Sequence, residues 1–280
     1  MSASAITRFL NAPGHLPADF PFTPAASGKL YLKSLFCYLV GTLFPIGVFL
    51  AFCQYAITYD LPLADALFAS DHFMLVMAVV STITFLSGFG AQFLFVRRAI
   101  LRQNSTVRDV LSLNVKNYQG SRNMLWGWGM LTFLVAAVLE QVVAALLPFK
   151  ITDSTAEMIN SMHGLSFALM ALLAVFAPVL EEIIFRGFVY GSLRTALHRR
   201  LPDQSAADFT RQRLLFDLLA AFVSALIFGL AHMNLAGLPL YVVSGMVFAE
   251  AYRRSGSLYV PMIGHFINNG VLMLLMILMH

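Results

Sequence analysis

The stretch VLEEIIFRGFVYGSL, residues 179–193, places three charged side chains inside an otherwise apolar run. Two adjacent carboxylates, Glu181 and Glu182, are followed four residues later by the guanidinium of Arg186. Ionisable groups near the centre of a bilayer cost about 2.5–3.5 kcal/mol each on insertion scales. The stretch therefore either anchors a helix at the membrane interface or performs a function inside the membrane.

The composition of the whole chain indicates a membrane protein. Of 280 residues, 59% are hydrophobic and 11% are charged, and the mean hydropathy is +0.77. Soluble domains carry roughly 25% charged residues, so this chain cannot cover a water-facing surface. The formal net charge is +4. No basic-aromatic cluster or phosphate-binding loop accompanies that charge, so no nucleic-acid partner is expected.

The apolar segments predict how many helices cross the bilayer. A bilayer core of about 30 Å needs about 20 apolar residues per helix. Segments free of acidic and basic residues are 34–59, 73–96, 123–139, 158–180, 218–249 and 255–280. The fifth is interrupted by NLAGLP at 234–239 and is interpreted as two spans. The sequence thus predicts an all-α polytopic helix bundle of about seven to eight transmembrane helices. Because residues 183–193 are too apolar for a solvated loop, the fourth span is expected to be one long helix over about 163–197, with a kink possible at Pro178.

The basic residues predict how the chain lies in the membrane. They precede the first span and follow the second, fourth and sixth: Arg8, Lys29, Lys33; Arg97, Arg98, Arg102, Arg108, Lys116, Arg122; Arg194, Arg199, Arg200, Arg211, Arg213; Arg253 and Arg254. The positive-inside rule then places the N-terminal segment 1–33 in the cytoplasm. The chain is expected to be a multi-pass protein of a bacterial cytoplasmic (inner) membrane. The first 28 residues have no apolar core, so no cleavable signal peptide is predicted.

The two adjacent carboxylates are expected to have different roles. Glu182 and Arg186 form an i,i+4 pair with the acid before the base, which is the favourable order on a helix. Glu181 lies about 100° around the helix axis from Glu182. Glu182 can therefore be neutralised within its own helix, whereas Glu181 needs a partner from another span.

Two later spans carry further polar side chains at helical spacing. FGLAH places Phe228 and His232 one turn apart, and HFINN does the same for His265 and Asn269. For either histidine alone, a helix-packing role is the alternative. In lipid each polar group needs a polar partner, so three apolar helices that carry such groups are expected to enclose one shared pocket.

These residues resemble the three motifs of the CPBP family (CAAX protease and bacteriocin-processing, ABI) of intramembrane endopeptidases. The motifs are EExxxR, here residues 181–186, FxxxH, residues 228–232, and HxxxN, residues 265–269. The resemblance covers residues from about 165 to 278. It implies a CPBP-type protease core over 158–280, preceded by N-terminal transmembrane helices over 34–150.

The resemblance also implies a glutamic mechanism of peptide-bond hydrolysis. Glu181 would deprotonate a water molecule that His232 helps to hold, and His265 with Asn269 would form the oxyanion site. Glu182 and Arg186 would brace the helix, and Phe228 would pack beneath His232. No cofactor is implied. A zinc ion is the alternative, because Glu and two His can bind zinc, although no HExxH helix is present.

Further polar residues in the apolar spans are expected to form ion pairs or to lie at the membrane interface. Asp217 is expected to pair with Arg213 and Glu250 with Arg254, and Glu140 to lie at the outer interface rather than in a substrate channel. Straight helices would place His232 about 28 Å beyond Arg213 but Glu181 only about 20 Å from Arg194. The expected substrate is a membrane-associated peptide or protein, and the sequence does not set the oligomeric state.

Two other functions fit the same polar pocket. One is a non-enzymatic scaffold or immunity protein that uses the pocket for binding. The other is a small transporter in which Glu181 and His232 relay protons.

Overall fold

The computed structural model describes residues 24–59, 61, 70–113, 122–148, 164–201 and 206–279. Its regular elements are helices, and the described residues contain no strand. The elements are α2 (Pro24–Thr58), α4 (Ser70–Leu101), α5 (Val107–Val110), α6 (Arg122–Leu146), α8 (Gly164–Glu182), η2 (Ile183–Tyr190), α9 (Gly191–His198), α10 (Ala206–Ala231), α11 (Leu238–Ser255) and α12 (Tyr259–Met279). Of the predicted N-terminal segment, residues 1–23 lie outside this description, and α2 already begins at Pro24.

The fold is an all-α membrane helix bundle, as the composition predicts. Six helical stretches in the described part of the chain are long and apolar enough to cross a membrane: 29–58, 72–101, 124–146, 164–198, 211–231 and 259–278. A seventh long helix, α11, is more polar because it ends in Glu250, Arg253 and Arg254. The predicted division of residues 218–249 is confirmed, since α10 ends at Ala231 and α11 begins at Leu238.

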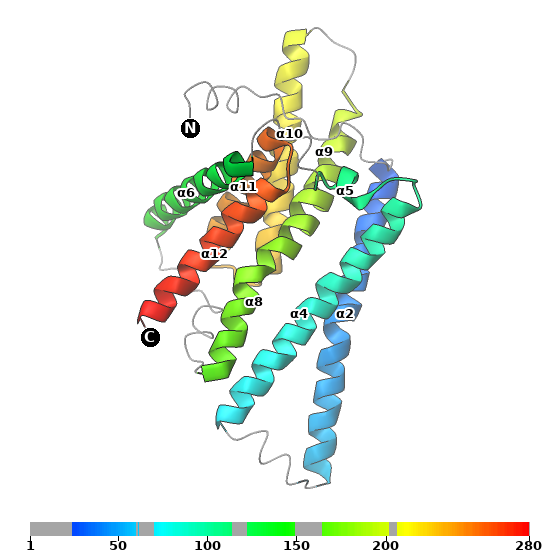
Figure 1. The fold of residues 1–280 in the computed structure, drawn as a ribbon. Helices are drawn as coiled ribbons and strands as arrows, with labels where there is room; N and C mark the ends of the chain where they lie inside the picture. Colours follow the sequence, from blue (N-terminus) through cyan, green and yellow to red (C-terminus); the bar gives the residue numbers. More distant parts are fainter. Residues whose placement is uncertain are drawn as a thin grey trace.

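The helices are arranged around the long stretch formed by α8, η2 and α9 (Figure 1). Helices α2 and α4 lie side by side, linked by the Ser87 hydroxyl, which donates to the Gly41 carbonyl at 2.6 Å. Helix α8 packs against α4 on one side and against α12 on the other. Helices α6, α10 and α11 complete the bundle on the α12 side. Apolar side chains such as Phe44, Leu146 and Leu278 are exposed on the outside, as a lipid-facing surface requires.

The predicted long helix over about 163–197 is confirmed, because helical structure is continuous from Gly164 to His198. Pro178 lies within α8, and the α-helical hydrogen-bond pattern changes further along the chain, in the π-helix from Ile183 to Tyr190. π-Helical turns are rare and are frequent at functional sites. The Phe185 carbonyl in this segment accepts a hydrogen bond from the Ser224 hydroxyl of α10 at 2.7 Å. The widened turn therefore lies directly after the two carboxylates and is held by a neighbouring helix.

Ion pairs at one end of the bundle connect three helices, α9, α10 and α11. Asp217 on α10 was expected to pair with Arg213. It pairs instead with Arg194 at 2.7 Å and with His198 at 2.8 Å. Arg253 on α11 lies 3.9 Å from the same carboxylate. The predicted Glu250–Arg254 pair is present at 2.5 Å.

The contact between Asp217 and Arg194 explains how His232 and Glu181 can lie at similar depths in the membrane. Asp217 and Arg194 are in contact, so they are a better common reference than Arg213. At a rise of about 1.5 Å per residue, His232 lies about 22 Å from Asp217, and Glu181 lies about 20 Å from Arg194. The two side chains therefore reach similar depths on neighbouring helices.

A glycine lets α10 and α11 approach closely. A Cβ atom added at Gly245 would lie 2.7 Å from the Cβ atom and 2.9 Å from the Cα atom of Ala225. Small residues at such crossings allow the close backbone contact that holds membrane helices together.

Replacing Gly245 with alanine is therefore expected to push α10 and α11 apart. The free energy of unfolding in detergent should fall by about 1–3 kcal/mol, the usual cost of overpacking, as followed by thermal denaturation. Gly47→Ala is the matched control, because nothing lies within 4 Å of a Cβ atom at that position. Equal thermal stabilities of the two variants would contradict this account of the helix crossing.

Candidate active site

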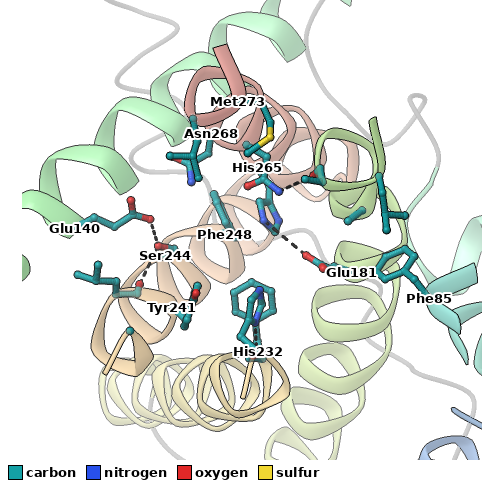
Figure 2. A pocket seen from close by; sticks show the side chains of 18 of the residues that line it. Phe85, Glu140, Glu181, His232, Tyr241, Ser244, Phe248, His265, Asn268 and Met273 are labelled. Carbon is teal, nitrogen blue, oxygen red and sulfur yellow. Dashed lines mark hydrogen bonds and ion pairs between the residues drawn. The ribbon is translucent and has the colours of Figure 1, made fainter. Parts of the chain in front are cut away.

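Residues from α8, α10 and α12 meet at one cavity of about 390 Å³. Its lining includes the predicted catalytic residues Glu181, His232, His265 and Asn269, and also Phe228. Figure 2 shows Glu181 from α8, His232 directly after the end of α10, and His265 from α12 directed toward a common space. The structure therefore brings together side chains that lie up to 88 positions apart in the sequence.

His265 lies between the two carboxylates of α8. Its Nδ1 atom is 2.8 Å from Glu182 Oε1, and its Nε2 atom is 3.7 Å from Glu181 Oε2. Because a carboxylate paired with arginine can only accept a hydrogen bond, Nδ1 carries a proton and donates it to Glu182. The other ring nitrogen then faces Glu181, and the ring of Phe248 stacks on the imidazole at a centroid distance of 4.8 Å.

Glu182 forms the predicted pair with Arg186, at 2.9 Å, and both side chains are fully buried. Its role extends beyond its own helix, because the same carboxylate oxygen accepts the hydrogen bond from His265. Glu182 thereby sets the position of an imidazole on α12. Glu181 differs from its neighbour, since 13% of its side chain is exposed and it lines the cavity.

Arg186 is held by aromatic rings as well as by Glu182. Its guanidinium carbon lies 4.3 Å from the ring centroid of Phe228 and 5.2 Å from that of Phe248. Its Nε and Nη2 atoms have no hydrogen-bond partner within the described segments. The cation therefore depends on one carboxylate and two ring faces, a combination that stabilises a buried guanidinium.

Phe228 and Tyr241 position His232. The ring of Phe228 packs edge-on against His232 at a centroid distance of 4.6 Å, and Tyr241 stacks on the imidazole at 4.2 Å. The Nδ1 atom of His232 is 2.9 Å from the Phe228 carbonyl. Because a carbonyl only accepts, Nδ1 carries the proton and Nε2 of the neutral ring is left as an acceptor.

Asn269 lines the cavity but also contacts the backbone of α8. Its Nδ2 atom donates to the Ala174 carbonyl at 2.8 Å. A side-chain amide has two N–H donors, so one of them remains for another partner. Asn269 thus ties α12 to α8, and the neighbouring Asn268 lines the same cavity.

The cavity lining includes residues that were not predicted from the sequence as part of the site, among them Tyr241, Ser244, Phe248 and Glu140. Tyr241 and Phe248 stack on the two histidines, and Ser244 contacts Glu140 through its hydroxyl. Glu140 was expected at the outer interface, yet it lines the cavity, which favours the alternative position in a substrate channel. The isolated carboxylate in an apolar span was the available signal for Glu140. The aromatic residues and Ser244 have no distinctive spacing in the sequence.

A zinc centre would need at least three ligand side chains close together. In the ranges that the structure describes, no three His, Cys, Asp or Glu side chains are grouped as metal ligands.

The fold and the cavity define a class: a polytopic membrane protein with a carboxylate–histidine centre enclosed by its helices. Residues 163–271 match the family model of type II CAAX prenyl endopeptidase Rce1-like proteins. Residues 163–271 are therefore similar to the membrane-embedded CAAX proteases, and this similarity supports a membrane endopeptidase.

Two curated bacterial proteins are similar to this chain. The membrane-embedded CAAX protease MroQ of Staphylococcus aureus (strain USA300) is 24% identical over 191 residues, which are 66% of this chain and 72% of MroQ. The membrane peptidase YdiL of Bacillus subtilis (strain 168) is 31% identical over 96 residues, which are 34% of this chain and 32% of YdiL. No solved structure matches.

Proposed function

We propose that this protein is a glutamic intramembrane endopeptidase that hydrolyses peptide bonds in membrane-associated peptides or proteins. One observation supports this best. Of the two adjacent carboxylates, Glu182 is fully buried and bound to Arg186 and His265, whereas Glu181 faces the cavity. Glu181 is therefore the carboxylate that can act on a bound water molecule.

Hydrolysis begins with a water molecule held between the carboxylate of Glu181 and the Nε2 acceptor of His232. Glu181 removes a proton from this water, and the oxygen of the water attacks the carbonyl carbon of the scissile bond. A tetrahedral intermediate forms, and the former carbonyl oxygen takes the negative charge. When the C–N bond breaks, Glu181 returns the proton to the departing amine. The carboxyl product keeps the oxygen of the water.

Donors for the developing oxyanion come from α12. The imidazole of His265, when both of its nitrogens carry a proton, presents an Nε2–H group beside Glu181. Glu182 holds the Nδ1–H group. The remaining N–H of Asn269 is a second donor, because its amide is oriented by the Ala174 carbonyl. Preorganised donors of this kind are worth most where water is scarce. No metal ion is needed for these steps.

The surroundings of the cavity support a membrane-associated substrate. The lining is mainly apolar, with residues such as Met170, Leu173 and Leu272, which suits a segment that enters from the membrane.

We place the chain in a bacterial cytoplasmic membrane with its N-terminus in the cytoplasm, because basic residues concentrate on that side. In this proposal, residues 158–280 form the catalytic core, and residues 34–150 provide the accompanying membrane helices.

The function is tested with the full-length chain purified in detergent and a library of quenched fluorogenic peptides. Cleavage products identified by mass spectrometry, and their loss in the Glu181→Gln variant, would support an endopeptidase. Reconstitution into liposomes tests the transporter. Proton-coupled uptake that depends on Glu181, without cleavage of any peptide, would overturn the proposal in favour of transport. Peptide binding with neither cleavage nor uptake would favour the scaffold.

A further inference from the structure

A second carboxylate enters the cavity from a helix that contributes none of the motif residues. Glu140 lies on α6, and its Oε1 atom contacts the hydroxyl of Ser244 on α11. Ser244 also contacts the Leu240 carbonyl within its own helix, at 2.9 Å. A side chain from a second helix therefore fixes the direction in which Glu140 points.

Glu140 forms no ion pair in the described part of the chain, and the imidazole of His265, which lies between Glu140 and Glu181, is held by Glu182. The ion pairs found there involve Glu181, Glu182, Asp217 and Glu250, but not Glu140. The residues that line the cavity include two glutamates and no lysine or arginine. A carboxylate in apolar surroundings without a counter-charge is costly. A cation brought by a bound ligand would offset that cost.

Glu140 and Glu181 lie on opposite sides of the cavity. Figure 2 shows Glu140 and Ser244 on one side and Glu181 on the other, with Phe248 and His265 between them. A peptide whose scissile carbonyl lies beside Glu181 can therefore extend a neighbouring side chain toward Glu140. The apolar residues between the two carboxylates, such as Leu240 and Phe248, suit the methylene stem of a long basic side chain.

We propose that Glu140 is a specificity-determining residue that binds a lysine or arginine side chain of the substrate, near the scissile bond. This inference rests on the proposed endopeptidase function and adds a substrate class to it. Ser244 orients the carboxylate, and the ammonium or guanidinium of the substrate supplies the missing positive charge. Charge-assisted hydrogen bonds are roughly twice as strong as neutral ones, so the preference should be marked.

The test measures binding separately from cleavage. The Glu181→Gln variant serves as the parent, and fluorescence anisotropy gives its affinity for labelled peptides that carry lysine at one position at a time. Each peptide has a twin with norleucine, which keeps the carbon chain and lacks the ammonium. At the best position, the lysine peptide is expected to bind about 10- to 100-fold more tightly than its twin.

Adding Glu140→Gln to this parent is expected to bring the ratio of the two affinities close to one. Adding Asp109→Asn instead is the control, since it removes the same charge at an exposed position outside the cavity. That control should keep the ratio. Thermal denaturation of both variants shows whether the fold is retained.

Three results would overturn the inference. The first is a norleucine peptide that binds as tightly as its lysine twin at every position. The second is a lysine preference that survives Glu140→Gln. The third is an equal loss of affinity for both twins, which would show a structural role. A lysine preference that depends on Glu140, in a protein that cleaves no peptide, would support the cation site and contradict the proteolytic function.

Discussion

Replacing Glu181 with glutamine is expected to lower kcat/KM for peptide cleavage by about 100- to 10,000-fold, the range that general acid–base catalysis contributes. The side-chain amide has nearly the same size as the carboxyl group, but it cannot take a proton from water at neutral pH. Its environment tolerates the change, because Glu181 is partly exposed at the cavity and its contact with His265 is long, at 3.7 Å. The rate of fluorogenic peptide cleavage by equal amounts of folded protein measures the effect.

Glu250→Gln is the matched control for this variant. It makes the same chemical change in a glutamate that pairs with Arg253 and Arg254 at the end of α11 and does not line the cavity. Its cleavage rate should remain near that of the unsubstituted protein. A Glu181→Gln variant that cleaves at the original rate would show that another group is the base.

Replacing Arg186 with methionine is expected to lower the free energy of unfolding by about 3–5 kcal/mol, the cost of breaking a buried ion pair by removing one partner. Glu182 would remain fully buried with His265 as its other partner. The ring contacts with Phe228 and Phe248 would lose their cation as well. Denaturant-induced unfolding in detergent, followed by tryptophan fluorescence, measures the change.

The double variant Glu182→Gln with Arg186→Met separates charge from packing. Because it removes both members of the ion pair, it should be more stable than Arg186→Met alone. Strictly additive losses would contradict the view that the unpaired carboxylate causes the destabilisation. An Arg186→Met protein as stable as the original would show that the pair contributes nothing.

Local features of the fold could be predicted from the sequence. The continuous helix over 164–198 follows from the apolar residues around Glu181, which cannot form a solvated loop. The division between α10 and α11 follows from the Asn, Gly and Pro residues at 234–239. The Glu182–Arg186 pair follows from helical spacing within one element. The π-helix over Ile183–Tyr190 was not predicted, because its residues have no composition that distinguishes it from an α-helix.

The candidate site was predictable in its members but not in its contacts. The motifs indicated that Glu181, His232, His265 and Asn269 would lie together, and they line one cavity. That His265 binds Glu182 more closely than Glu181, and that Asn269 contacts Ala174, depends on how α12 is rotated against α8. No spacing in the sequence reports this rotation.

The sequence by itself determined what each helix could do alone: where it spans, which residues share its faces, and which of its charges neutralise one another one turn apart. These properties depend on the 3.6-residue repeat and on the cost of charge in lipid. Only the tertiary structure decided that Glu140 of α6 meets Ser244 of α11 and faces the same cavity as Glu181. Contacts between helices far apart in the sequence depend on the packing of the whole bundle, which no local pattern encodes.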